Sequence, residues 1–552
     1  MSPSRIIVVG AGLGGLAAAI RLQAAGHSVT LLEKRAQLGG RAAQLRAAGY
    51  TFDMGPSIIT APHLLRDLWA SANARIEDDV ELVPLAPYYR IYFADGRHFD
   101  YGGAQDQVEA QIRAFDPRAV NGYRRFMAAT RHIYRRAFDD LAGQPFHELG
   151  TFLKLVPELL RLNAAQSVYD FVSRFFPSPQ LRMVFSFHPL FIGGNPFRAS
   201  AIYSIVPYLE SQGGVWFARG GMYAVVEAMH ALFSRLGGQT RLSTAVEEVL
   251  VDDRTRRATG VRLARGESLT AEAVVLNADV ATAYTQLVPA RYRRRMSDRR
   301  LHGYRYSMSC FLLYLGLDRQ YSQLLHHTII MAPRYRELIR DIFDGQGLPS
   351  DMSLYLHAPT KTDHTMAPHG GESLYVLVPV PHLGRGIDWT REAQPFRDRI
   401  VRFLERDFGL TGLEQSIKFE QRYTPLDFRD DLSSYLGSAF SIEPTLLQSA
   451  YFRPHNASED VAGLYLVGAG THPGAGIPGV LLSASITSRL VTDTVGRPAP
   501  VAAASSMVTS VSGSLENRRE VGPKVPRMLD AVPAAALARG PDASAAHEAV
   551  RS

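Results

Sequence analysis

The feature that most constrains this chain is Gly10-Ala-Gly12-Leu-Gly14-Gly15, a run that fits G-x-G-x-x-G. The apolar run 5–10 before it predicts a buried parallel strand, residues 13–25 predict a helix, and 28–33 predict a second strand. Gly10 permits a tight turn, Gly12 lets the backbone approach a pyrophosphate, and Gly15 lets the helix pack close to the strand. Glu33 ends the second strand near the offset expected of an acid that holds a ribose hydroxyl. The pattern predicts a dinucleotide-binding βαβ unit; the alternative is a glycine-rich turn in an unrelated α/β fold.

Two further segments extend this unit. Gly39-Gly40-Arg41 follows closely after Glu33, and a guanidinium that can pair with a phosphate suits such a position. The alternative is an ordinary surface turn with an exposed arginine. Phe52-Asp-Met-Gly-Pro-Ser57 comes next and contains a Gly-Pro turn.

The order of segments predicts one nucleotide domain built from both ends of the chain. Strands are expected over 81–100, 246–251, 260–264, 272–277, 304–317 and 372–381, and helices over most of 105–240. A strand over 463–468 enters the glycine-rich run 468–480, and a helix is expected over 481–495. The predicted divisions are nucleotide domain 1–80, 241–300 and 441–496, a helical substrate region 81–240, and a second substrate part 301–440. Residues 497–552 are rich in Ala, Pro and Ser and lack aromatics, which predicts a disordered tail.

Composition excludes a disordered chain, a collagen and a small disulfide scaffold. The 552 residues are 46% hydrophobic, enough for a large core, and no apolar run is long enough to span a membrane. The single cysteine, Cys310, indicates a reducing compartment, and the N-terminus lacks a signal-peptide pattern, so we expect a cytoplasmic protein. The formal charge of +7 comes almost entirely from arginine. It reflects either genomic base composition or a preference for anionic partners; an anionic membrane surface stays open, whereas no nucleic-acid-binding motif is found.

The chain resembles the bacterial-type carotenoid desaturases, the phytoene desaturase family, within the FAD-dependent amine-oxidase-like flavoproteins. The resemblance covers about residues 5–495, and the last segment that carries it is the most diagnostic. The carrying segments are Gly10–Arg41, Phe52–Ile59, Phe185–Phe197, Gly214–Gly221 and Gly463–Leu482.

This resemblance implies an α/β fold in which a Rossmann-type FAD-binding domain, of the two-dinucleotide-binding-domain flavoprotein type, carries an inserted α+β substrate domain and a helical membrane-facing region. It implies that the ADP half of FAD lies on the first glycine run and Glu33, with Val246 giving a backbone contact to adenine. The isoalloxazine would meet 55–57 and 474–480. The full expected FAD site is Gly10, Gly12, Gly14, Gly15, Glu33, Lys34, Gly39, Gly40, Arg41, Gly55, Pro56, Ser57, Val246, Gly470, Gly476, Ile477, Pro478, Gly479 and Val480.

The implied reaction is the desaturation of phytoene to lycopene or a related polyene by hydride transfer to the flavin. The substrate is a long isoprenoid hydrocarbon without a polar handle, so an apolar channel must recognise it by shape. Because that hydrocarbon resides in lipid, we expect the protein to associate peripherally with the inner membrane. Segment 152–162 is either an amphipathic membrane contact or a core-facing helix.

Several alternatives remain open. They are a C30 diapophytoene desaturase, another carotenoid dehydrogenase or ketolase, an amine oxidase, and a lipid-escort protein on the same fold. No metal site is expected, because the sequence has no H-E-x-x-H motif and no cysteine pair. His188, His326 and His327 are expected to be hydrogen-bonded structural histidines, and no catalytic base is assigned. The number of double bonds introduced, the terminal electron acceptor and the oligomeric state are not predicted.

Overall fold

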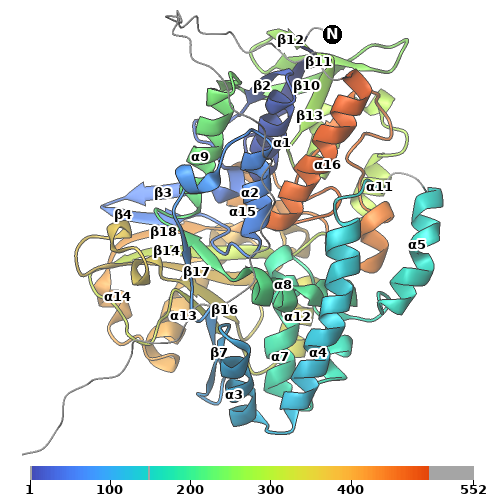
Figure 1. Cartoon of the computed structure of the whole chain (residues 1–552). Coiled ribbons are helices and arrows are strands. Elements are labelled where there is room, and N and C mark those ends of the chain that lie inside the picture. The colour runs from blue at the N-terminus through green and yellow to red at the C-terminus, as the bar shows by residue number, and fades with distance from the viewer. Residues whose placement is uncertain (1–2, 147–148, 497–552) are drawn as a thin grey trace, which may run out of the picture. The chain divides into compact units, whose positions relative to one another are not determined.

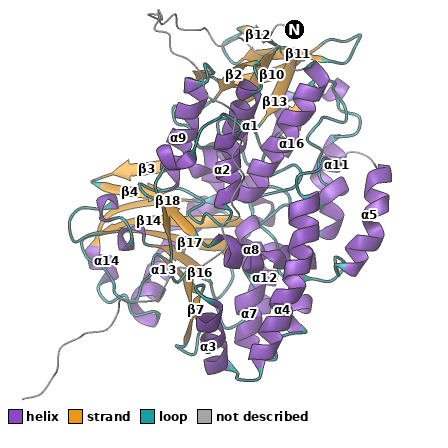
Figure 2. Ribbon diagram, viewed as in Figure 1, coloured by secondary structure: helices purple, strands orange, loops and turns teal. Residues whose placement is uncertain are grey.

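The computed structural model describes residues 3–146 and 149–496. A five-stranded, all-parallel sheet forms its first layer (Figures 1 and 2). The strand order is β19 (Leu464–Leu466), β13 (Ala273–Leu276), β1 (Arg5–Val9), β2 (Ser28–Leu32) and β9 (Gln239–Arg241). One sheet thus joins strands from the first, middle and last thirds of the chain. The predicted tail 497–552 lies outside the described residues.

Alternation along β1 explains the layers on either side of this sheet. Ile6 and Val8 pack with helices α1 (Leu13–Ala24), α9 (Met222–Arg235) and α16 (Ile477–Val495). Ile7 and Val9 point the other way and pack on a small antiparallel sheet. That sheet consists of β10 (Val246–Val251), β11 (Ala258–Leu263) and β12 (Ser268–Thr270). Successive side chains of a strand point to opposite faces, so a strand that is apolar at every position must be covered on both sides.

A seven-stranded mixed sheet forms the second large layer. Its order is β18 (Ile417–Tyr423), β14 (Ser309–Leu317), β17 (Glu372–Val380), β16 (Leu354–His357), β15 (His327–Ile330), β6 (Tyr89–Tyr92) and β7 (His98–Tyr101). Two two-stranded sheets complete the strands: β3 (Gln44–Ala47) with β4 (Tyr50–Asp53), and β5 (Leu82–Pro84) with β8 (Trp216–Ala218).

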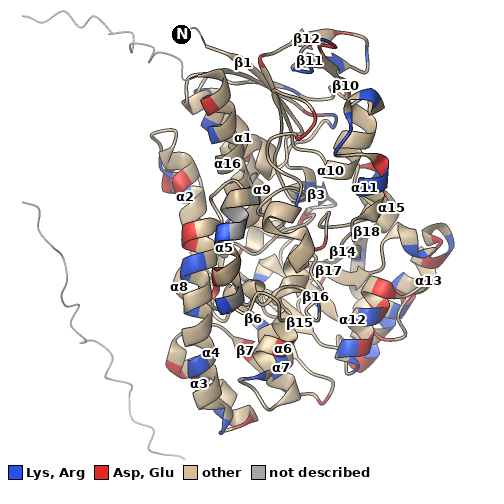
Figure 3. Cartoon of the chain, turned by 90° about the vertical axis from the view of Figure 1, so that its right-hand side faces the viewer, with Lys and Arg blue, Asp and Glu red and all other residues tan. Residues whose placement is uncertain are grey.

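Helices make up most of the stretch from 105 to 235, as the sequence predicts. They are α3 (Gln105–Phe115), α4 (Ala119–Ile133), α5 (Leu149–Arg161), α6 (Val168–Ser173), α7 (Pro179–Ser186), α8 (Val206–Gly213) and α9. The remaining helices are α2 (Pro62–Ala70), α10 (Val280–Thr282), α11 (Asp298–Gly303), α12 (Tyr335–Asp344), α13 (Trp389–Arg402), α14 (Leu413–Ser416) and α15 (Pro425–Asp430). Acidic and basic residues are interspersed along α12 and α13, so the arginine excess does not gather into one basic face there (Figure 3).

The structure corrects two predicted boundaries. The last helix begins at Ile477, not at residue 481, because Pro478 occupies its first turn, where the missing N–H of proline costs no helical hydrogen bond. The strand predicted over 304–317 begins only at Ser309. Among the described residues, no helix is both long and apolar enough to cross a bilayer.

Candidate FAD and substrate site

The first glycine run and the Gly39–Arg41 turn lie against each other. The backbone N–H of Gly39 donates to the carbonyl of Ala11 at 2.9 Å, and Gly12 and Gly39 form a parallel bridge. Gly10 has φ of 98°, a conformation that favours glycine. A Cβ on Gly15 would stand 2.0 Å from the carbonyl oxygen of Gly10. Gly15 therefore serves the packing of α1 on β1, as expected. It does not line the cavity, although the predicted FAD site included it.

Glu33 and Arg41 supply the charged side chains beside these two glycine turns. The buried Glu33 carboxylate accepts the N–H of Ala11 at 2.8 Å and that of Arg35 at 2.9 Å. The Arg41 guanidinium donates to Ser434 Oγ at 2.7 Å, and burial lowers its pKa. Its buried Nε has no partner among the described residues. A partly buried guanidinium with a buried, unused N–H beside a glycine turn fits the pyrophosphate of FAD.

One cavity of about 870 Å³ joins this turn to the second layer. Gly470 does not line it, because its α-carbon faces Val280, where an added Cβ would approach Cγ1 to 2.8 Å. The other predicted residues that line the cavity are Gly10, Gly12, Gly14, Glu33, Lys34, Gly39, Gly40, Arg41, Gly55, Pro56, Ser57, Val246, Gly476, Ile477, Pro478, Gly479 and Val480. The structure thus brings five segments of sequence (10–14, 33–41, 55–57, 246 and 476–480) to one cavity, with room for a ligand of cofactor size.

Beyond this wall the cavity runs over the seven-stranded sheet. Leu312, Leu377, Tyr355 and Ile329 stand opposite one another on neighbouring strands and all line it. Most other side chains on this part of the cavity are apolar, and they come from helical segments and from residues that flank the strands: Phe138, Leu141, Phe187, Phe191, Ile192, Ile202, Leu209, Met308 and Met331. Such a lining offers a long hydrocarbon contact area and few hydrogen-bonding groups.

The cavity reaches the surface at an apolar edge. Leu447 and Phe452 line the cavity and are 71% and 37% exposed. Val156 and Leu159 also line it. Both belong to α5, so the predicted segment 152–162 does contain a helix.

Sequence reasoning missed a buried polar pair in the apolar wall. Glu210 and His188 are almost fully buried and line the cavity. Glu210 accepts a hydrogen bond from Tyr89, and its other oxygen lies 3.6 Å from His188 Nε2. Neither ring nitrogen of His188 has a hydrogen bond among the described residues. The expectation that His188 is a hydrogen-bonded structural histidine is therefore wrong, since its ring stacks on Phe187 and faces a carboxylate instead.

Sequence reasoning also missed Arg453, a fully buried guanidinium beneath the C-terminal glycine run. It donates to the carbonyls of Thr471 at 3.0 Å and Ala469 at 2.6 Å within that run. It donates to Gln448 and Ile442 as well. These bonds set the path by which the run reaches the cavity, and no local pattern around residue 453 signals them.

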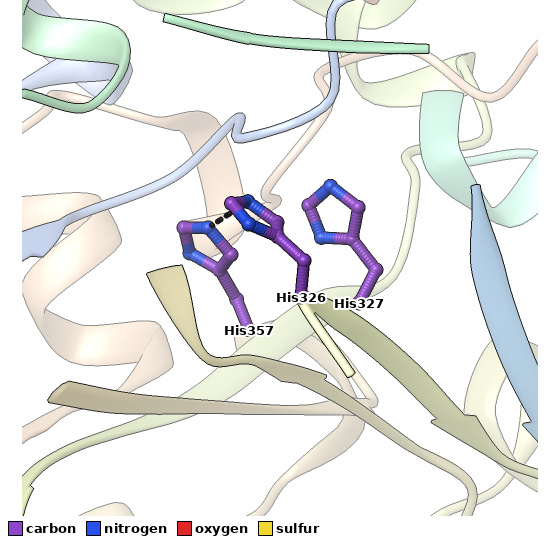
Figure 4. Close-up of side chains that lie close together, drawn as sticks. All are labelled: His326, His327 and His357. Carbon is purple, nitrogen blue, oxygen red and sulfur yellow. Dashed lines mark hydrogen bonds between the residues drawn. The ribbon is translucent and has the colours of Figure 1, made fainter. Parts of the chain in front are cut away.

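Three buried histidines, His326, His327 and His357, lie close together on or beside strands β15 and β16 (Figure 4). His326 bonds to Thr362 and to His357, and His327 bonds to Tyr355, which confirms the structural reading of His326 and His327. Burial lowers the pKa of all three, that of His326 to about 3. They are therefore neutral near pH 7.

The sequence and the fold are similar to those of known proteins. A model of the flavin containing amine oxidoreductase family matches residues 13–492. A lycopene-forming phytoene desaturase from Pseudescherichia vulneris is 48% identical over 88% of this chain and 99% of its own. A 4,4'-diapophytoene desaturase from Methylomonas is 34% identical over 88% of this chain and 94% of its own. Cyclohexylamine oxidase from Brevibacterium oxydans has the same fold, with a TM-score of 0.57 at 16% identity over 89% of this chain and 99% of its own.

Proposed function

Because the chain belongs to the flavin containing amine oxidoreductase family and, within it, to the phytoene desaturases, we propose that it desaturates phytoene to lycopene with FAD as its electron acceptor. The observation that carries the proposal is the single cavity that joins the glycine turn at Gly12 to an apolar channel over the sheet. The lycopene-forming relative is considerably more similar than the C30 relative, at 48% against 34% identity. The expected C40 substrate is therefore favoured over the C30 alternative.

We propose that the FAD contacts are those expected from the sequence, less the two glycines that serve packing. Arg41 and the turn at Gly12 would hold the pyrophosphate, and Glu33 would accept a ribose hydroxyl. Ser57 and the start of α16 would face the ring. When bound, FAD supplies an oxidised ring that accepts a hydride from the substrate.

The protein's own residues bind and orient the hydrocarbon through the shape of the apolar cavity. The side chains of Leu312, Leu377 and Ile329 give an apolar floor on the sheet, and the aromatic side chains Phe187 and Phe191 also line the cavity. Such walls exclude water and hold the reacting carbons in one line, which is the main requirement when no strong base is needed. Carbons next to double bonds tolerate developing positive charge as the hydride leaves. The adjacent carbon then loses a proton, for which a weak acceptor suffices, so we assign no residue as its base.

Conversion of substrate tests the proposal directly. Expression of the chain in a host that makes phytoene should replace phytoene with lycopene, detected by chromatography of the pigments. A parallel host that makes diapophytoene should show much less conversion, because the channel is proposed to fit the longer chain. Phytoene that stays unchanged in the first host would refute the proposed function, and preferential conversion of diapophytoene would favour the C30 alternative.

We further propose that the cavity's apolar edge docks on a membrane surface, which would let a lipid-dissolved substrate enter without crossing water. Leu447 is the most exposed large apolar side chain among the described residues. Arg295 and Arg300 line a neighbouring surface hollow together with Leu447 and Phe452. Arg300 is paired with Glu459 at 3.1 Å, and Arg295 adds a cationic group next to the apolar edge.

Replacing Leu447 with aspartate should weaken binding to vesicles of phosphatidylcholine and phosphatidylglycerol by about tenfold or more, since a buried leucine contributes roughly 1.5–3 kcal/mol. Cosedimentation with the vesicles measures the change. Leu242 provides a matched control, because its side chain is 39% exposed and does not line the cavity. Equal loss of binding for Leu242→Asp and Leu447→Asp would contradict docking at this edge.

A further inference from the structure

A chain of hydrogen bonds runs from the cavity into the protein behind Ser57. Ser57 Oγ lies 2.6 Å from Tyr355 Oη, and the same Oη lies 2.7 Å from His327 Nδ1. Ser57 and Tyr355 line the cavity, whereas His327 is completely buried beneath it. The three residues come from the turn after β4, from β16 and from β15, so the chain forms only in the folded protein.

The direction in which hydrogen bonds are donated along this chain follows from its buried end, His327. Burial, together with the neighbouring His326 and His357, lowers the pKa of His327 well below its usual value, so the ring is neutral and has one N–H. His327 Nε2 is buried and has no hydrogen-bond partner among the described residues. A buried N–H without a partner is rarer than an unused lone pair, which places the proton on Nδ1.

The other two donors then point the same way. With His327 Nδ1–H donating to Tyr355 Oη, the tyrosine hydroxyl donates to Ser57 Oγ. The Ser57 hydroxyl can then donate its own proton in a hydrogen bond to an acceptor in the cavity. Figure 4 shows that His326 and His357 bond to each other and that His327 stands beside this pair, outside its hydrogen bond.

We propose that His327 and Tyr355 are positioning residues that orient the Ser57 hydroxyl as a hydrogen-bond donor to an acceptor atom of the FAD ring. This inference rests on the proposed function, because it takes the FAD site as its premise. A donor aimed at the ring stabilises the form with more negative charge, which is the reduced ring. This chain of hydrogen bonds therefore raises the midpoint potential of bound FAD and favours uptake of electrons from the substrate.

The test is the midpoint potential of FAD bound to the purified full chain, measured by equilibration with redox dyes. Ser57→Ala and Tyr355→Phe should each lower the preference for reduced over oxidised FAD by about tenfold, a shift of about 30 mV for two electrons. The midpoint potential of the double variant should shift no further than that of either single variant, since both substitutions break the same chain of hydrogen bonds. His327→Leu should behave like Tyr355→Phe, whereas His327→Asn should recover part of the potential, because its amide can donate from near the Nδ1 position.

Thr362→Val is the matched control. It removes the 2.6 Å hydrogen bond between Thr362 Oγ1 and His326 Nδ1, within the same histidine cluster but outside the chain, and should leave the potential unchanged. An unchanged potential in Ser57→Ala with FAD bound would overturn the inference alone, and that variant decides if the Tyr355 variants fail to fold. An equal shift in Thr362→Val would also overturn it. A wild-type chain that binds no FAD would overturn the proposed function first.

Discussion

Gly12→Val is expected to abolish retention of FAD while leaving the chain folded. Gly12 precedes α1 with φ of −73° and ψ of 173°, a conformation open to any residue, so valine brings no backbone strain. An added Cβ would lie 3.0 Å from Asn277 Nδ2 and 3.8 Å from the carbonyl oxygen of Gly39. The branched side chain would occupy the space through which the pyrophosphate is proposed to approach the backbone. We expect FAD affinity to fall by at least about 100-fold, a loss of about 2.7 kcal/mol.

The flavin absorbance that remains with the protein after gel filtration measures this loss, and circular dichroism checks that the fold persists. Gly303→Val is the control, because a Cβ at the end of α11 meets nothing within 4 Å. Gly303→Val should stay yellow and keep its activity. A yellow, active Gly12→Val protein would show that the assigned phosphate turn is wrong.

The features that the sequence predicts well are those with a local cause. The strand before Gly10, the helix after Gly12 and the acid at Glu33 all belong to one continuous βαβ unit, and the structure has each of them. The paired glycines before Arg41 follow within the same stretch. Their contacts with the first turn form between segments close in sequence, such as Gly39 with Ala11.

The features that the sequence does not predict depend on pairing between distant segments. Tyr355 bonds to Ser57 across 298 positions, and only the register of β16 with its neighbours brings them together. Glu210 and His188 lie on separate helical segments whose apolar neighbours conceal them as ordinary core positions. The start of α16 was misplaced for a different reason: Gly476, Pro478 and Gly479 resemble a loop in sequence, yet proline in a first turn is compatible with a helix.

Arg453→Met is expected to destabilise the protein strongly and to loosen the FAD site at its C-terminal wall. Arg453 is 1% exposed, and its guanidinium donates to four carbonyls, those of Ile442, Gln448, Ala469 and Thr471. Burial lowers its pKa, but arginine keeps its charge in proteins, and the four carbonyl dipoles offset the cost of burying it. Methionine has a similar length and no donor, so it leaves these buried oxygens without their partner.

The expected loss in the free energy of unfolding is about 3 kcal/mol or more, because each buried carbonyl oxygen left without a donor costs about 1–3 kcal/mol. Denaturant titration measures it, and the flavin content of the purified variant should fall in parallel, because Ala469 and Gly476 line the cavity. Arg453→Lys should recover only part of the stability, since an ammonium group cannot reproduce the planar set of donors that spans four carbonyls. Arg340→Met is the control, because Arg340 is 72% exposed and 4.0 Å from its nearest acidic oxygen. If Arg453→Met unfolded at the wild-type denaturant midpoint with full flavin content, Arg453 would not be what holds the glycine run against the cavity.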